Sequence, residues 1–144
     1  MTDRARPGKI VCVGRNYAEH AREMGNDVPE RPLLFLKPPM SAHVEYEGEI
    51  GVVIGARLSN VSEDEAVGAI RGIVAVNDVT ARDLQKSDGQ WTRAKGFDTF
   101  CPIGPEAPAP RDLSGLEVVT RVNGQERQRG VARQMAFPIP TILA

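Results

Sequence analysis

The sequence has few cysteines, no long apolar run and no excess of charge of either sign. Cys12 and Cys101 are isolated, which excludes a zinc-ligand pattern and a disulfide framework, and Cys12 is expected to be a packed thiol. A net charge of −1 gives no basic face, so nucleic acid is not the expected partner. No run approaches the length of a membrane span, and Met1–Gly8 lacks an apolar signal core. These absences predict a soluble cytoplasmic protein without a membrane partner.

The pattern of apolar residues predicts several short strands within one domain. At 144 residues the chain is long enough for a single hydrophobic core. Four apolar, partly β-branched runs are typical of buried strands, at residues 9–13, 33–36, 50–54 and 73–76. Asn123-Gly124 stands between 116–122 and 125–129, which predicts a β-hairpin with a type I′ turn.

Capping and breaking residues predict where helices begin and end. Residues 18–24 form a helical stretch that Gly25 and Asn26 stop. Ser62–Glu65 has the form of a capping box, which predicts a helix through Ala69. Thr80–Asp83 has the same form, so Thr80 is expected to begin another helix. Polar or proline-rich composition predicts loops and connectors at residues 86–96, 102–110 and 137–140.

Carboxylates alternate with other residues just before the run at 50–54. Glu45, Glu47 and Glu49 are spaced by two, so in a strand their side chains point to the same face. Like charges on one face repel, and at the edge of a core they also lose hydration. A hard divalent cation with oxygen ligands would compensate them. The alternative is an acidic edge strand that faces water.

Asp78 follows the buried run 73–76 at a strand-to-helix turn. It is either a turn-forming residue or a third carboxylate. If it meets Glu47 and Glu49, the three would complete an all-oxygen metal site.

His20 and Glu23 lie three residues apart on the helical stretch 18–24, so they share a face. A carboxylate beside an imidazole fixes its tautomer and raises its basicity, which is how a general base is built. The alternative is an ordinary surface His–Glu pair.

Two lysines and one pair of polar residues are further site candidates. Lys37 stands where a strand passes into a rigid loop, a frequent position for site residues, although a solvated lysine fits equally well. Lys95 precedes aromatic residues and is a candidate electrophile, with a lysine extending to the surface as the alternative. Arg82 and Gln85 are three residues apart and face the same side.

Five stretches in this order resemble the fumarylacetoacetate hydrolase family, in particular its small acylpyruvate hydrolase and oxaloacetate decarboxylase members. The stretches are Gly14–Met24, Phe35–Pro39, Tyr46–Glu49, Asn77–Asp83 and Trp91–Lys95. The resemblance implies an α+β fold, a mixed β-roll with a few short helices. It also implies Mg²⁺ or Mn²⁺ as cofactor and a homodimer as the assembly.

The resemblance also implies a role for each matching residue. The metal ligands would be Glu47, Glu49 and Asp78. The catalytic residues would be the base pair His20 and Glu23, on a lid-like segment, together with Lys95 beside the reacting carbonyl. The substrate pocket would be lined by Arg15, Lys37, Arg82 and Gln85.

The activity that this resemblance implies is metal-dependent cleavage of a C–C bond in a small 2-oxo acid, as acylpyruvate hydrolysis or oxaloacetate decarboxylation. Isomerisation or decarboxylation of unsaturated dicarboxylates and dehydration of sugar acids are alternatives with the same metal ligands. A non-catalytic metal-binding member is the alternative from another class.

The chain departs from the family pattern at two places. Nine residues separate Lys37 from Glu47, where the family has a longer loop and a strand. The sequence ends at Ala144, before the family's glycine- and threonine-rich closing segment. The expectation is therefore a single domain over residues 1–144 that lacks both segments, either as a shortened variant or because the printed sequence omits them.

Overall fold

The computed structural model describes residues 12–23, 25, 27–35 and 43–144. The strands of this part are β1 (Cys12–Gly14), β2 (Leu33–Phe35), β3 (Val44–Glu45), β4 (Gly48–Ile54), β5 (Ile70–Asn77), β6 (Thr80–Ala81), β7 (Glu117–Val122) and β8 (Gln125–Val131). Its α-helices are α1 (Ala18–Glu23), α2 (Glu63–Gly68), α3 (Arg82–Ser87), α4 (Thr92–Lys95) and α5 (Ile139–Leu143), and its 3₁₀ turns are η1 (Leu113–Gly115) and η2 (Ala132–Gln134).

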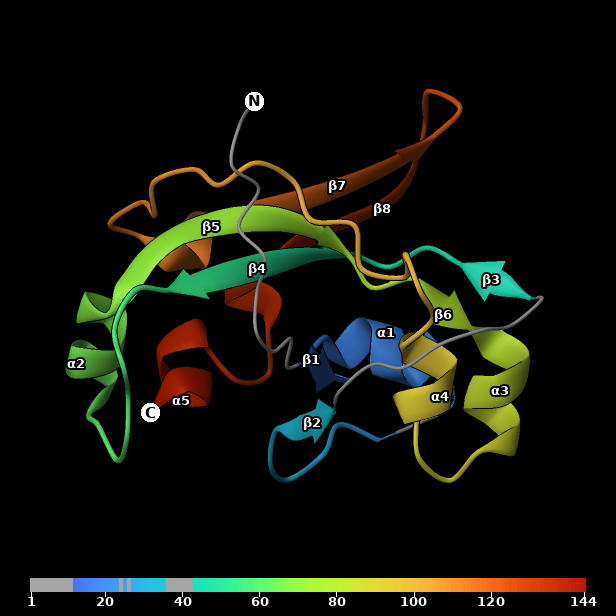
Figure 1. Cartoon of the computed structure of the whole chain (residues 1–144), viewed down its shortest axis with the longest axis horizontal. Coiled ribbons are helices and arrows are strands. Elements are labelled where there is room, and N and C mark those ends of the chain that lie inside the picture. Colours follow the sequence, from blue (N-terminus) through green and yellow to red (C-terminus); the bar gives the residue numbers. More distant parts are fainter. Residues whose placement is uncertain (1–11, 24, 26, 36–42) are drawn as a thin grey trace.

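A long curved pair of strands, β4 and β5, forms the middle of the molecule (Figure 1). These strands are antiparallel, with Gly48 opposite Asn77 at one end and Ile54 opposite Ile70 at the other. The hairpin of β7 and β8 lies along this pair, while α2 and α5 pack together at its far end. β3, β6, α3 and α4 gather at the end where β4 begins and β5 ends (Figure 1).

The strands of the described residues pair in antiparallel two-stranded sheets, β1 with β2, β3 with β6, β4 with β5 and β7 with β8, and do not close into a barrel. Short helices between them complete an α+β architecture. Because β4 begins and β5 ends at the same end of their sheet, residues next to these two points are brought together.

The hydrophobic core of the described residues lies under one face of the β4–β5 pair. Leu113, Ala132 and Ile139 are buried there, and Ile50 and Val52 of β4 pack against them. Burial of apolar side chains stabilises a fold by about 25 cal/mol per Å². This packing anchors the middle of β4 and leaves its first residues at the edge of the core, next to polar groups.

Two local predictions are confirmed by the backbone. Asn123 and Gly124 both have positive φ, 52° and 80°, as the two central residues of a type I′ turn require. Ser62 caps α2 as predicted, since its side chain accepts a hydrogen bond from the backbone N–H of Glu65 while the Glu65 carboxylate accepts one from the backbone N–H of Ser62.

Three local predictions are wrong. Thr80 does not cap a helix, because it pairs with Glu45 between β6 and β3 and its hydroxyl donates to Asp78 O, so α3 begins at Arg82. The expected loop at 86–96 contains α4. The proline-containing stretch at 137–140 leads into α5, where proline is tolerated in the first turn because its missing N–H has no partner there.

Part of the N-terminal prediction lies outside the described residues. This applies to the first residues of the expected strand at 9–13 and to 36–42, which include Lys37 and most of the short connection to Glu47. The side chain of Cys12 is likewise not described. Among the helices that are described, none is both long and apolar enough to cross a membrane.

Candidate metal centre

Three carboxylates converge where β4 begins and β5 ends. Glu47 immediately precedes β4, Glu49 is its second residue, and Asp78 immediately follows β5. One oxygen from each lies within 4.8 Å of the others. Asp78 is fully buried, and the two glutamates are partly buried. Residues about thirty positions apart in the chain thus form one acidic cluster, as the sequence predicts for Asp78.

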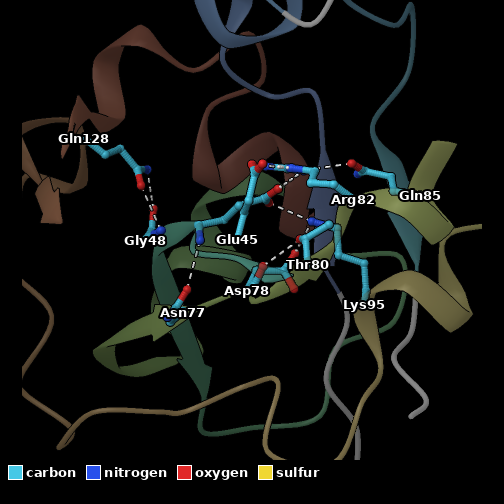
Figure 2. Close-up of polar contacts among 10 residues, drawn as sticks. Glu45, Gly48, Asn77, Asp78, Thr80, Arg82, Gln85, Lys95 and Gln128 are labelled. Carbon is cyan, nitrogen blue, oxygen red and sulfur yellow. Dashed lines mark hydrogen bonds and ion pairs between the residues drawn. The ribbon is translucent and has the colours of Figure 1, made fainter. Parts of the chain in front are cut away.

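Lys95 projects from α4 toward Asp78 of this acidic cluster (Figure 2). Its ammonium donates to Glu47 Oε2 at 2.6 Å and to Asp78 Oδ2 at 2.8 Å, and its side chain is only 3% exposed. Burial by itself lowers the pKa of Lys95, but Glu47 and Asp78 outweigh burial and raise this pKa above its ordinary value. The lysine is therefore a buried ammonium, and the alternative of a surface lysine is wrong.

Arg82 is the second buried cation of the site. Its Nη1 lies 2.6 Å from Glu47 Oε1, and the same nitrogen donates to Gln85 Oε1 at 2.7 Å. Its Nε donates to Glu45 Oε2 at 2.8 Å. Burial favours the neutral form of Arg82, yet Glu45 and Glu47 hold its pKa above the ordinary value. Arg82 and Gln85 thus lie on one side of α3, as the sequence predicts.

Glu45 does not join the other carboxylates, which corrects the expectation that Glu45, Glu47 and Glu49 share one face. The strand is interrupted at Tyr46 and Glu47, so β3 pairs with β6 and β4 pairs with β5. This change of partner breaks the two-residue alternation. Glu45 has a half-exposed side chain and binds Arg82.

The charge of Glu47 is stabilised despite its burial. Burial alone would raise its pKa, but Lys95 and then Arg82 more than offset that effect, so the pKa of Glu47 lies below its ordinary value. Glu47 therefore carries its charge near neutral pH and accepts from both cations.

The backbone around Glu47 and Gly48 is held by amide side chains. Glu47 N–H donates to Asn77 Oδ1 at 2.9 Å, and Glu47 O accepts from Asp78 N–H at 2.8 Å. Gly48 N–H donates to Gln128 Oε1 at 2.9 Å, and Gly48 O accepts from Gln128 Nε2 at 2.7 Å (Figure 2). Sequence patterns give no signal for Gln128, while Asn77 could have been found as the polar neighbour of Asp78 at the end of a buried strand.

The N-terminal site candidates are described only in part. Arg15 has a positive φ of 55°, and its guanidinium carbon lies 5.5 Å from the centre of the Trp91 ring. His20 and Glu23 both lie on α1, but the positions of their side chains are outside the described part of the structure, as is all of Lys37. Their joint action with the acidic cluster stays a prediction.

Tyr17, which sequence reasoning missed, lies near the acidic cluster. Burial raises its pKa first, and the negative charge of Glu49 raises it further. Its ring also approaches β8, since a Cβ placed on Gly130 would lie 3.3 Å from it. Tyr17 immediately precedes α1, so the charge of Glu49 acts on the residue that leads into that helix.

The donor set of the acidic cluster fits a hard divalent cation. Mg²⁺, Mn²⁺ and Ca²⁺ prefer carboxylate oxygens, and oxygens around one such ion lie up to about 4–5 Å apart. The three carboxylates meet this condition, since one oxygen from each lies within 4.8 Å of the others. Lys95 and Arg82 supply positive charge on one side, which limits the repulsion among the carboxylates.

Comparisons with known proteins identify the family of this chain. The sequence matches the family described as fumarylacetoacetate (FAA) hydrolase C-terminal over residues 9–144. It is 40% identical to the oxaloacetate tautomerase YisK of Bacillus subtilis, covering 96% of this chain and 53% of that protein. It is 41% identical to a mitochondrial oxaloacetate tautomerase of Arabidopsis thaliana, covering 94% of this chain and 70% of that protein.

A solved structure shows the same architecture. The 5-carboxymethyl-2-hydroxymuconate delta-isomerase from Mycobacterium smegmatis superposes with a TM-score of 0.80 at 42% identity, covering 94% of this chain and 59% of that one. The chain thus spans between about half and 70% of the length of these three proteins. The predicted fold, that of the family's C-terminal domain, is confirmed, with its strands in paired sheets. This chain belongs to the fumarylacetoacetate hydrolase family.

Proposed function

We propose that the protein is a divalent-metal-dependent enzyme that acts on a small 2-oxo acid. In the reaction, negative charge develops on the keto oxygen as a bond to the neighbouring carbon changes. The observation that carries this proposal is the convergence of Glu47, Glu49 and Asp78 with the buried ammonium of Lys95. A structural ion site would have no need of a buried lysine between its carboxylates, whereas a reaction that builds negative charge on oxygen would use one.

Each residue of this group has a role in the proposal. Glu47, Glu49 and Asp78 would hold Mg²⁺ or Mn²⁺, which when bound supplies Lewis-acid polarisation of the 2-oxo group. Lys95 would donate a hydrogen bond to the oxygen on which charge develops, because two carboxylates keep its ammonium protonated and fixed in place. Arg82 would keep Glu47 oriented through its 2.6 Å contact.

The other predicted residues complete the proposed pocket. Arg15 and Lys37 would face the carboxylate of the substrate as cations, with Gln85 as a neutral hydrogen-bonding partner. Arg82 contributes to this pocket only through a guanidinium that already contacts Glu45, Glu47 and Gln85. We therefore assign Arg82 a positioning role ahead of direct substrate binding.

Keto–enol proton transfer is the first candidate reaction. Two relatives carry the name oxaloacetate tautomerase, and a similar solved structure carries that of a hydroxymuconate isomerase. Both names describe a proton moved between carbon and another atom of an oxo acid, without loss of any group. The proposal extends this reaction class to the present chain.

Cleavage of a C–C bond is the second candidate, because it starts from the same polarised 2-oxo group. Hydrolysis of an acylpyruvate would also need a water deprotonated by His20, with Glu23 orienting the imidazole. Decarboxylation of oxaloacetate would need no water. His20 therefore separates hydrolysis from decarboxylation. Keto–enol transfer also moves a proton between carbon and oxygen, and His20 is the residue that would accept and return it.

The test uses the purified protein with Mg²⁺ or Mn²⁺ and three assays. Loss of the enol absorbance of oxaloacetate reports tautomerisation, release of CO₂ reports decarboxylation, and disappearance of acetylpyruvate reports hydrolysis. We expect metal-dependent acceleration of at least the first. If metal-loaded protein accelerates none of the three, the proposal is wrong.

The variant His20→Ala sorts the candidates. We expect it to lower acetylpyruvate hydrolysis about 10²–10⁴-fold, the usual contribution of a general base, and to change decarboxylation less. Unchanged hydrolysis in this variant would show that His20 is not the base. Arg22→Ala, an exposed position of the same helix, is the matched control.

A further inference from the structure

Gly48 separates Glu47 from Glu49, so its backbone angles set how these two carboxylates lie relative to each other. Glycine has the widest range of φ and ψ of all residues. A cation that binds both glutamates would have to restrict this glycine, and the lost conformational freedom would weaken binding. β5 restrains this glycine from one side, since Gly48 stands opposite Asn77 and Asp78 N–H donates to Glu47 O. Contacts to the N–H and C=O of Gly48 itself would complete the restriction.

Gln128 of β8 makes the contacts that fix it. Gly48 N–H donates to Gln128 Oε1 at 2.9 Å, and Gln128 Nε2 donates to Gly48 O at 2.7 Å. The first contact holds the peptide group that joins Glu47 to Gly48, and the second holds the one that joins Gly48 to Glu49. One side-chain amide thus grips both peptide groups between the two carboxylates (Figure 2).

The amide of Gln128 is itself oriented by the hairpin. Thr120 of β7 stands opposite Gln128 in the strand register, and its hydroxyl donates to Gln128 Oε1 at 3.1 Å. The oxygen of the amide therefore accepts from two donors while its nitrogen donates to Gly48. This pattern fixes which way round the amide lies.

The close approach of the hairpin requires glycine at position 48. A Cβ placed there would collide with Thr120 Oγ1 and lie 3.3 Å from Gln128 Oε1. Any larger residue would displace the Thr120 hydroxyl and open the contact with Gln128. The identity of residue 48 and the Thr120–Gln128 pair thus depend on each other.

We propose that Gln128 is a positioning residue for the metal centre, which fixes Gly48 by both of its flanking peptide groups and so holds Glu47 and Glu49 in the arrangement that binds a divalent cation. The inference rests on the proposed function, because it assumes that these carboxylates bind metal. It assigns the β7–β8 hairpin, which supplies no metal ligand, a role in metal affinity.

The test measures Mn²⁺ binding to metal-free protein by the loss of the free Mn²⁺ electron paramagnetic resonance signal. Gln128→Met keeps the length of the side chain and removes both hydrogen bonds to Gly48. We expect Mn²⁺ affinity to fall about 10- to 100-fold, the range seen when a group that orients a metal ligand is lost. Turnover at saturating Mn²⁺ should fall much less, because the ligands themselves are intact.

Two control variants separate positioning from general stability. Gln125→Met changes the same residue type in the same strand, where the exposed side chain accepts from Arg127. Asn123→Ala destabilises the hairpin at its distant turn, because alanine disfavours the positive φ of 52°. Both should bind Mn²⁺ like the wild type, even where Asn123→Ala unfolds at a lower temperature.

A second substitution keeps the inference testable if Gln128→Met does not fold. Gly48→Ala adds one methyl group that collides with Thr120 and opens the same contact from the other side. It should weaken Mn²⁺ binding to a similar degree. If the wild type binds Mn²⁺ and Gln128→Met or Gly48→Ala binds it equally well, the positioning role is overturned and the proposed function stands. If the wild type binds no Mn²⁺, both are overturned.

Discussion

Two groups of ion pairs in this molecule have the same contact distances and opposite surroundings. In the acidic cluster, Lys95 lies 2.6 Å from Glu47 and 2.8 Å from Asp78. On the hairpin, Arg129 lies 2.6 Å from Glu117 and 2.8 Å from Glu126. The Lys95 side chain is 3% exposed, whereas that of Arg129 is 47% exposed.

The difference in burial gives the two groups different consequences. Water and salt screen most of the attraction between the two charges of an exposed pair, so such pairs contribute little to stability. Buried charges cost hydration, so a buried pair is stable only while every member keeps its partners, and removal of one is expensive. Substitutions in the hairpin pairs should therefore change the free energy of unfolding little. Loss of any one of Glu47, Asp78 and Lys95 should be costly, which is the behaviour expected of a group with a functional role.

The largest expected effect of breaking the buried group is on catalysis. Asp78→Asn removes one carboxylate charge without changing the size of a fully buried side chain. Metal polarisation is worth several kcal/mol, so turnover of oxaloacetate should fall by about 10³-fold. Circular dichroism checks the fold. Turnover within a factor of two of the wild type would remove Asp78 from the metal centre.

The next effect concerns the ammonium in the metal-free protein. Lys95→Met leaves Glu47 and Asp78 without the cation that they share, which should cost about 3 kcal/mol of unfolding free energy by urea denaturation. A bound divalent cation should restore that charge. Mn²⁺ should therefore raise the melting temperature of Lys95→Met more than that of the wild type.

Lys86→Met is the matched control for this experiment, because Lys86 is exposed on α3. It should respond to Mn²⁺ like the wild type. Equal Mn²⁺-induced shifts in Lys95→Met and the wild type would mean that the lysine and the metal do not serve the same carboxylates.

Lowering the pH should have a smaller effect, and it should change the stability contribution of the buried group differently from that of the exposed one. Because Lys95 and Arg82 hold the folded-state pKa of Glu47 below its ordinary value, the ionised group contributes stability that is fully present above the unfolded-state pKa of about 4.3. That contribution is lost as the pH falls through the folded-state pKa. The stability difference between the wild type and Glu47→Gln should shrink over that acidic range.

Urea denaturation of the metal-free proteins between pH 7 and pH 3 measures this effect. The loss should persist in high salt, since Glu47 is largely buried, whereas any acid effect of Glu126→Gln on the exposed hairpin should be screened. A stability difference for Glu47→Gln that stays constant across this range would contradict the direction of the pKa shift.

The smallest effect is expected on the hairpin. Arg129→Ala removes contacts to both Glu117 and Glu126. Because these groups are exposed, the urea midpoint at physiological salt should stay within experimental error of the wild type. Mn²⁺ affinity should also be unchanged, although Arg129 neighbours Gln128 in the sequence. A marked loss of stability would show that exposure does not separate the two groups as stated.

Local signals in the sequence predicted those parts of the fold that depend on neighbouring residues. Asn123-Gly124 predicts the hairpin, and Ser62 with Glu65 predicts the capped helix, since both interactions close within four residues. The same reasoning failed at Thr80, where pairing with Glu45 of β3 outweighed the local capping pattern. Tertiary pairing overrides a local signal wherever a short strand finds a partner.

The candidate site could be predicted in its acidic residues but not in what holds them. Two-residue spacing and the position of Asp78 pointed to the cluster, yet the interruption between β3 and β4 sent Glu45 to Arg82 instead. Gln128 was missed because it contacts a backbone 80 residues away, and backbone groups carry no sequence signal. Hydrogen bonds to distant peptide groups are visible only in the folded chain.

Mn²⁺ titration of the metal-free wild type and of Glu49→Gln tests the central claim most directly. Glu49 contributes one oxygen to the cluster. The wild type should bind one ion per acidic cluster, and Glu49→Gln should bind it at least about 10-fold more weakly, because a neutral amide is a poorer ligand for a hard cation than a carboxylate. No binding by the wild type, or equal affinity in the two proteins, would contradict a metal centre built on Glu47, Glu49 and Asp78.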